Sequence, residues 1–326
     1  MRKIGILEWQ IGNNNESLNH FSLCLELSNK YNFKEISASL MNNLGVLYKG
    51  QGKIEEAEKL YHESSEIERQ LGNKQGIANS LNNLGILYKG QGKIKEAEKL
   101  YHESLEISRQ LGNKQFIANS LNNLGILYKR QGKIKEAEKL YHESLEIRRQ
   151  LGNKQGISRS LNNLGYLNFE KGEFANAKIF YLEAILLKIE LNDTRGIIGS
   201  IHRAFSLLEN SERKKYYLLA KSLIIESSKP NQLSQLANIE LMQYCLSNKE
   251  VEIAIIQEKT KYLIQQKEKS TLEDIDDLPV EALYLAAQKL NAIGEKEFVK
   301  VFANEVLKMI GELRSIRKEF FEKILQ

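Results

Sequence analysis

The chain has 326 residues, of which 42% are apolar and 27% are charged, and its formal net charge at pH 7 is +5. This balance is ordinary for a soluble helical protein, and the mild positive charge permits acidic partners without requiring a nucleic acid. Only two prolines occur, which favours long uninterrupted helices.

Targeting and redox signals point to a cytoplasmic protein. Cys24 and Cys245 lie far apart and match no metal-ligand or redox spacing, so we expect both to be buried thiols in a reducing compartment. Glu8 interrupts the apolar stretch that a signal peptide would need. No apolar run approaches the length of a membrane span, so no membrane association is predicted.

A 40-residue period runs through most of the chain. The segment 77–116 recurs almost unchanged as 117–156, and the copies differ at three positions: Gly90/Arg130, Ser108/Arg148 and Phe116/Gly156. A fixed period of this length predicts a stacked repeat architecture. The opening residues 1–36 keep the phase, since Gly5 stands forty residues before Gly45, and we expect them to form a truncated or capping first repeat.

Each repeat predicts a helical hairpin. Apolar and small residues recur at i, i+3, i+4 and i+7 in the first helix, and Gly90-Gln91-Gly92 then breaks the pattern. A second helix is expected to start near Lys93 and to end at a left-handed cap on Gly112 or Asn113. The residues expected to meet where the two helices cross are Gly85, Tyr88, Ala97 and Tyr101.

These residues resemble the tetratricopeptide repeat. Leu81-x2-Leu84-Gly85-x2-Tyr88 followed by Ala97-x3-Tyr101 is similar to that family's W-x2-L-G-x2-Y and A-x3-F pattern, with Leu for the usual Trp and no closing Pro. The 40-residue period resembles the longer repeats of Pins/LGN-type adaptors and kinesin light chains. The resemblance implies an all-α fold, a right-handed superhelical α-solenoid of stacked antiparallel helix hairpins.

The expected domain organisation follows the period. Four regular units are predicted at 37–76, 77–116, 117–156 and 157–196. A degenerate repeat follows at 197–229, with helices expected at 197–208 and 213–227. Residues 230–326 are expected to form a helical C-terminal region, with helices near 232–247, 250–268, 280–292 and 295–325.

The long final helix carries an apolar seam with heptad spacing. Its residues are Phe302, Val306, Met309, Leu313, Ile316 and Phe320. The seam fits a capping helix packed on the preceding hairpin, and it also fits a homodimer or docking surface. Fewer than three heptads leave both readings open.

A second stripe on each first helix predicts a ligand surface. It lies about 130° around the helix from the core face, at 100° per residue, and the resemblance implies that it lines the concave groove. Asparagines at a 40-residue spacing would present amide groups to an extended peptide, and lysines would favour an acidic segment. The predicted peptide-binding residues are Asn42, Asn79, Asn82, Ile86, Lys89, Asn119, Asn122, Ile126, Lys129, Arg130, Arg159, Asn162 and Tyr166.

Two functional readings remain open. The first is a scaffold that binds a protein or peptide segment. The second is a peptide-sensing regulator like the bacterial Rap and PlcR receptors, with residues 231–326 as its effector or dimerisation region.

We find no phosphate loop, nucleophile elbow or catalytic triad, so no enzyme activity, cofactor or metal is predicted. The repeated His62, His102 and His142 are taken as surface residues, and nucleic-acid binding is disfavoured.

Overall fold

The computed structural model describes residues 2–11, 13–225 and 280–292, together with 237, 239–243, 245–246, 256, 258, 295, 298–300, 303–304, 307 and 322–323. All regular secondary structure in these ranges is helical. This confirms the all-α fold of stacked helix hairpins. The six residues of the predicted C-terminal seam lie outside the described residues, and so do most of the helices predicted between 230 and 326.

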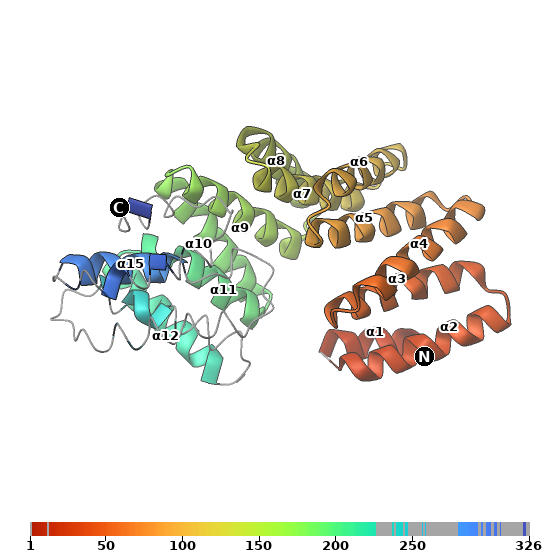
Figure 1. Cartoon of the computed structure of the whole chain (residues 1–326), viewed down its shortest axis with the longest axis horizontal. Helices are drawn as coiled ribbons and strands as arrows, with labels where there is room; N and C mark the ends of the chain where they lie inside the picture. The colour runs from red at the N-terminus through yellow and green to blue at the C-terminus, as the bar shows by residue number, and fades with distance from the viewer. Residues whose placement is uncertain are drawn as a thin grey trace. The chain divides into compact units, whose positions relative to one another are not determined.

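The chain divides into two compact units, each described here by itself. The first comprises 1–131 and 135–147, and the second comprises 132–134 and 148–326. The helices of the first unit, drawn from red to yellow in Figure 1, are α1 (Arg2–Ile11), α2 (Asn14–Lys30), α3 (Lys34–Gly50), α4 (Ile54–Gln70), α5 (Lys74–Gly90), α6 (Ile94–Gln110), α7 (Lys114–Arg130) and most of α8 (Ile134–Gln150). Those of the second are α9 (Lys154–Glu170), α10 (Phe174–Glu190), α11 (Thr194–Ala204), α12 (Asn210–Ile225) and α15 (Val280–Ala292), with a 3₁₀ turn η1 (Phe205–Leu207) after α11.

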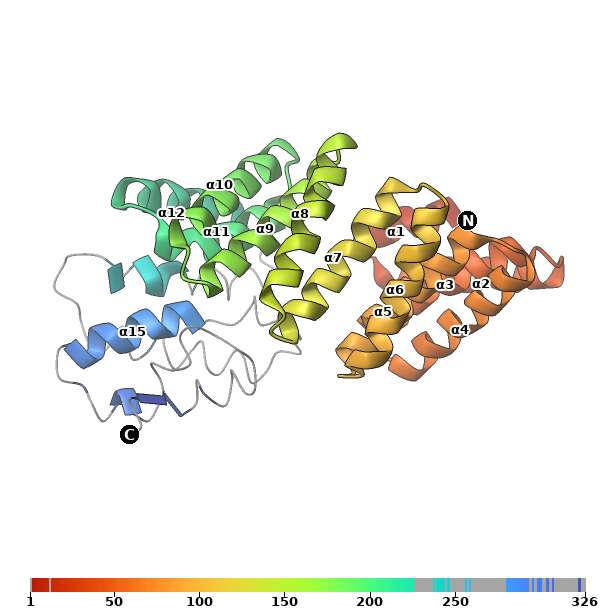
Figure 2. The ribbon, with the colours of Figure 1, turned by 90° about the horizontal axis from the view of Figure 1, so that it is seen from above.

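Consecutive helices pack against one another to form the hairpins. In the first unit α3 packs on α4 and α5 on α6, and among the first helices α3 contacts α5 and α5 contacts α7 (Figures 1 and 2). They therefore form one layer, and the second helices form the other. In the second unit α9 packs on α10, α10 on α11 and α11 on α12.

The turns follow the predicted glycines with two refinements. Helix α5 continues through Gly90, and the left-handed residue that ends it is Gly92, at φ +76°. After α6 the left-handed residue is Gly112, at φ +62°, while Asn113 caps α7 by accepting a hydrogen bond from the Phe116 amide at 3.2 Å. The turn before α7 therefore combines a positive-φ residue with a side-chain cap, whereas the Gly92 turn leads into α6 with no side-chain cap on Lys93.

The predicted crossing contact is confirmed at Gly85. A Cβ placed on Gly85 would lie 2.6 Å from Cε1 of Tyr101, and both Tyr101 and Ala97 are buried. Tyr88 was predicted to be a core residue beside this crossing, and it packs against the cluster that contains Ala97 and Tyr101. It is only half-buried, however, and its hydroxyl donates to Glu58 at 2.8 Å. Burial, together with that carboxylate, raises the pKa of Tyr88 to about 12.

The degenerate repeat keeps the hairpin plan with shifted bounds. Its first helix begins earlier than predicted, at Thr194, and tightens into η1 before it ends. Its second helix begins at Asn210 rather than 213. Asn192 takes the positive φ of 52° that glycine takes in the preceding turns.

Candidate functional site

The predicted ligand stripe lies on the first helices, but its residues differ in accessibility. Arg159 is exposed, whereas Asn42, Asn122 and Asn162 are only 4%, 3% and 8% exposed. The remaining predicted residues are half-buried: Asn79, Asn82, Ile86, Lys89, Asn119, Ile126, Lys129, Arg130 and Tyr166. The stripe is therefore a partly covered surface rather than an open row of amides.

Asn42 belongs to the packing between repeats. Its Nδ2 donates to the hydroxyls of Ser64 at 2.6 Å and Ser80 at 2.9 Å. Its Oδ1 accepts from Asn83 at 3.2 Å. Because these bonds join three helices, the prediction of an open groove amide at Asn42 was wrong.

The same inter-repeat amide pair recurs one hairpin later. Asn123 Nδ2 donates to Asn82 Oδ1 at 2.7 Å. Asn83 and Asn123 directly follow the predicted residues Asn82 and Asn122 and were not themselves predicted. Ile86, predicted as an apolar ligand contact, packs partly on the cluster around Tyr101 and Leu124. The stripe in the first unit therefore holds adjacent hairpins together as well as facing the groove.

A second repeating position places buried charges beside the stripe. Residues 68, 108, 148 and 188 are Glu, Ser, Arg and Lys, and the residue eight positions later is Gly, Phe, Gly and Gly respectively. Arg148, 1% exposed, donates to the Gly156 carbonyl at 3.0 Å and to Ser160 at 2.7 Å. A Cβ on Gly156 would lie 2.8 Å from Arg148 Cδ.

Lys188 repeats this arrangement. Its Nζ donates to the Gly196 carbonyl at 3.1 Å and to the Ser200 hydroxyl at 2.9 Å. A long charged side chain thus accompanies glycine, and the short Ser108 accompanies Phe116. Two of the three differences between the near-identical repeats are therefore physically coupled.

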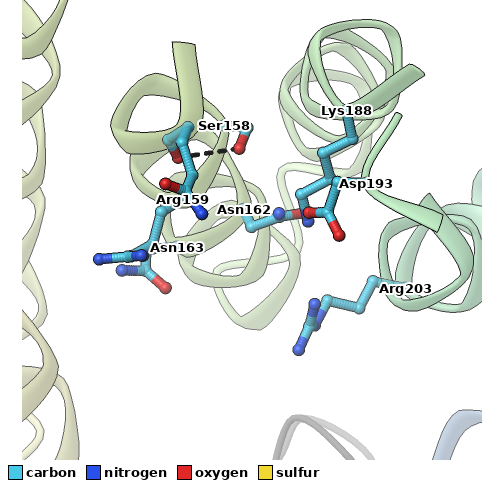
Figure 3. A pocket seen from close by; sticks show the side chains of 8 residues that line it. Ser158, Arg159, Asn162, Asn163, Lys188, Asp193 and Arg203 are labelled. Carbon is cyan, nitrogen blue, oxygen red and sulfur yellow. Dashed lines mark hydrogen bonds between the residues drawn. The ribbon is translucent and has the colours of Figure 1, made fainter. Parts of the chain in front are cut away.

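In the second unit Lys188 borders a cavity of about 230 Å³ on the first-helix face. It is lined by Gln155, Ser158, Arg159, Asn162, Asn163, Lys188, Asp193 and Arg203. Figure 3 shows Arg159 and Asn163 on one side of the cavity and Lys188, Asp193 and Arg203 on the other. We refer to it as the basic cavity, because three cationic side chains face one carboxylate.

Burial gives the basic cavity an unusual lysine. Burial and the neighbouring Arg203 together lower the pKa of Lys188 to about 8, while Asp193 opposes the shift. In the described part of the chain, the side chains of Arg159 and Arg203 make no hydrogen bond or ion pair. The arrangement favours an anion, whose charge would offset the repulsion between these cations.

Sequence reasoning found two of the eight lining residues, Arg159 and Asn162. It missed Arg203 and Lys188, although both stand in phase with the repeat: Arg203 lies forty residues after Asn163, and Lys188 lies forty after Arg148. Comparing residues at equivalent positions across all repeats would have found them.

His202 occupies the next position of the asparagine series, forty residues after Asn162. It is 7% exposed, and burial lowers its pKa to about 3, with Arg203 adding to the shift. The unfolded chain takes up a proton near pH 6.5, so His202 costs stability as the pH falls from there toward 3. We expect about 2 kcal/mol of this loss between pH 7 and pH 4.5.

Urea unfolding of wild type and His202→Asn at both pH values checks this, since Asn is the residue of the preceding repeat. The variant should lose distinctly less stability on acidification than wild type. An equal loss in both proteins would assign the acid sensitivity to other groups.

No group of three or more His, Cys, Asp or Glu side chains suited to a metal occurs among the described residues. His102 Nε2 lies 3.0 Å from the Tyr128 hydroxyl. Cys245 is buried, and burial raises its thiol pKa to about 12, while Cys24 is only half-buried.

No helix in the described part of the chain is long and apolar enough to cross a bilayer.

Residues 36–110 and 116–187 match the family model described as tetratricopeptide repeat. Comparison with curated protein sequences finds no match. Among solved structures, the apo form of the quorum sensor NprR from B. thuringiensis is similar at TM-score 0.65 and 17% identity, over 94% of this chain and 84% of that one.

Two further structures are similar over most of their length. Aspartyl phosphate phosphatase F from Bacillus subtilis has TM-score 0.63 and 12% identity, over 93% of this chain and 74% of that one. The apo form of RapI has TM-score 0.59 and 12% identity, over 90% and 97%. At such identities these likenesses establish the fold.

Proposed function

Because the chain belongs to the tetratricopeptide repeat family, we propose that it is a non-enzymatic scaffold that binds an extended peptide segment along its first helices. An acidic group of that segment occupies the basic cavity. The observation that carries this proposal is the meeting of Arg159, Lys188 and Arg203 at one cavity on the first-helix face. The proposed cellular setting is the cytoplasm.

The basic cavity suits a carboxylate. Arg159 and Arg203 are guanidinium groups, which bind a carboxylate through two parallel hydrogen bonds. Lys188 is already held by Gly196 and Ser200, so its ammonium is fixed in place before a ligand arrives. A bound anion would also favour the charged state of this buried lysine.

Amide side chains beside the cations supply contacts for a peptide backbone. Gln155, Asn162 and Asn163 line the basic cavity, and each carboxamide both donates and accepts. In the first unit, the half-buried Asn79, Asn82 and Asn119 offer the same chemistry, with Lys89, Lys129 and Arg130 as nearby cations. Tyr166 adds an aromatic surface in the second unit.

Selection from a random peptide library tests the proposal. Peptides enriched on the wild-type chain should carry an Asp, a Glu or a free C-terminal carboxylate at a fixed place. The double variant Arg159→Ala/Arg203→Ala should bind them at least about 30-fold more weakly, since hydrogen bonds to charged groups contribute roughly 1.5–3 kcal/mol each. Fluorescence anisotropy with a labelled selected peptide measures the change.

The matched control is Lys135→Ala/Lys139→Ala, which removes two exposed cations from α8 and lowers the net charge equally. This variant should bind like wild type. If the control and the arginine variant weaken binding by the same factor, the attraction is a general charge effect and the basic cavity is not the site.

A peptide-sensing regulator is the second candidate, with residues 231–326 as its effector or dimerisation region. It is favoured by the extent of the fold match, because the likeness to the quorum sensor NprR continues over 94% of this chain. A sensor should change its oligomeric state or scattering profile when the selected peptide binds. A scaffold should keep both.

A further inference from the structure

A second cavity lies in the first unit, beside the N-terminal ends of α3 and α5. Its volume is about 550 Å³, and it is lined by Glu35, Ile36, Ser39, Asn42, Glu68, Asn73, Gln75, Gly76, Asn79 and Phe116. Ser39, Asn42 and Asn79 place it on the first-helix face. We refer to it as the acidic cavity, because its lining contains two carboxylates and no cationic side chain.

Glu68 is the unusual residue of the acidic cavity. It is 3% exposed, and its Oε2 has no hydrogen-bond partner among the described residues. Burial raises the pKa of Glu68, and Glu35 raises it further, whereas a hydrogen bond from Asn73 lowers it. A buried carboxylate oxygen without a partner is costly in a folded chain.

The fold does not require a carboxylate at this position. Ser28 and Ser108 occupy it in neighbouring repeats, where Ile36 and Phe116 stand eight residues later. Gly76 leaves room for the longer Glu68, because a Cβ there would overlap the Glu68 carboxylate. The unit 37–76 thus has Glu at position 68 and Gly at position 76, and this combination admits a buried carboxylate that lines the cavity.

The remaining lining fits a cation. Phe116 is an aromatic lining residue, and an aromatic ring attracts a cation electrostatically. Asn79 contributes a carboxamide to the lining, whereas the amide oxygens of Asn42 and Asn73 already accept from Asn83 and from the Gly76 amide. The N-terminus of α5 carries a partial positive charge of about half a unit, which offsets only part of the two carboxylates. Its Gly76 amide already donates to Asn73 at 3.2 Å.

We propose that the acidic cavity binds an alkylammonium or guanidinium group through Glu68 and Glu35, with Phe116 against its face. The group is carried either by a Lys or Arg side chain of a bound peptide or by a free polyamine. The assignment of the cation to a side chain of a bound peptide rests on the proposed function. The binding of a cation by Glu68 and Glu35 does not depend on it.

Titration of the ¹⁵N-labelled full chain, followed at the Gly76 and Asn79 amides, tests the proposal. The probes are end-blocked Ala-Arg-Ala and Ala-Lys-Ala, spermidine, and end-blocked Ala-norleucine-Ala as the neutral control. Cationic probes should shift both amides, and the norleucine peptide should not. Tighter binding by the blocked peptides indicates a side-chain ligand, and tighter binding by spermidine indicates a free polyamine.

Glu68→Gln and Glu68→Ser should weaken cation binding at least tenfold, and Glu63→Gln, which removes a partly exposed carboxylate from the same helix, should not. Glu68→Ser should also unfold at an equal or higher urea concentration than wild type, because serine fits this position in two other repeats. Unchanged cation binding in both Glu68 variants, or no response to any cation, would overturn the proposal. Arg159→Ala/Arg203→Ala should respond to the cations like wild type, which separates this test from that of the basic cavity.

Discussion

Gly85→Ala is expected to destabilise the chain by at least about 2 kcal/mol, in the upper range of overpacking effects. The added methyl would lie 2.6 Å from Cε1 and 2.8 Å from Cδ1 of the buried Tyr101 ring. The ring has no solvent-facing side toward which it could shift, since Tyr101 is 0% exposed. Either the ring leaves its position or the two helices of the hairpin separate. Urea unfolding measures the loss.

Gly50 provides the matched control, because the chain itself carries Arg130 at the equivalent position two repeats later. Nothing lies within 4 Å of a Cβ placed on Gly50. Gly50→Arg should therefore be neutral or stabilising by up to about 1 kcal/mol, since arginine has the higher helix propensity. A similar loss in both variants would mean that glycines of the first helices matter for a reason other than the tyrosine contact.

The pair Arg148 and Gly156 should show strong coupling. Gly156→Phe alone is expected to cost about 3 kcal/mol or more, because the new ring would occupy the space of a buried guanidinium chain. Arg148→Ser alone removes the hydrogen bonds to Gly156 and Ser160 and leaves a void. The double variant reproduces the Ser108/Phe116 combination and should regain much of the loss, with a coupling energy of about 2–3 kcal/mol.

A double-mutant cycle by urea unfolding supplies the four stabilities. Additive losses would show that the residues at positions 148 and 156 contribute to stability independently. The pairing of Ser108 with Phe116 would then have no packing origin. The cycle also bears on the acidic cavity, because Glu68 and Gly76 are the same pair of positions in the second repeat.

Much of the fold could be predicted from the period alone. The recurrence of glycine and tyrosine at fixed places specifies a hairpin crossing that admits only glycine, and the contact between Gly85 and Tyr101 has that form. The hairpin turns could also be predicted from recurring glycines, since Gly92 and Gly112 adopt the left-handed backbone conformation. Such features depend on residues close in sequence, or one repeat apart.

The accessibility of the ligand stripe could not be predicted in the same way. A helical projection places Asn42 on the inner face, but it does not say how closely the next first helix approaches. In the structure Ser80 and Asn83 of that helix occupy the hydrogen-bonding groups of Asn42. The expectation that amides on this face are open therefore failed where the repeats pack most closely.

Buried charge was the other feature hidden from sequence reasoning. Arg148 and Glu68 lie on second helices that are otherwise rich in solvated charges, and charged residues are rarely buried. Only the pairing with glycine eight residues later distinguishes them, and that contact is visible once the hairpins are folded. The same pairing recurs at Lys188, which lines the basic cavity.

The most direct test of the proposed binding surface is photo-crosslinking with a selected peptide that carries a photoreactive residue beside its acidic group, followed by mass spectrometry. The account predicts crosslinks to α9 and α11, in peptides that contain Gln155, Arg159, Asn163 or Arg203, and loss of these crosslinks in Arg159→Ala/Arg203→Ala. Crosslinks confined to the outward residues of α10 or α12, and retained in the double variant, would contradict it, because the ligand would then lie on the second helices.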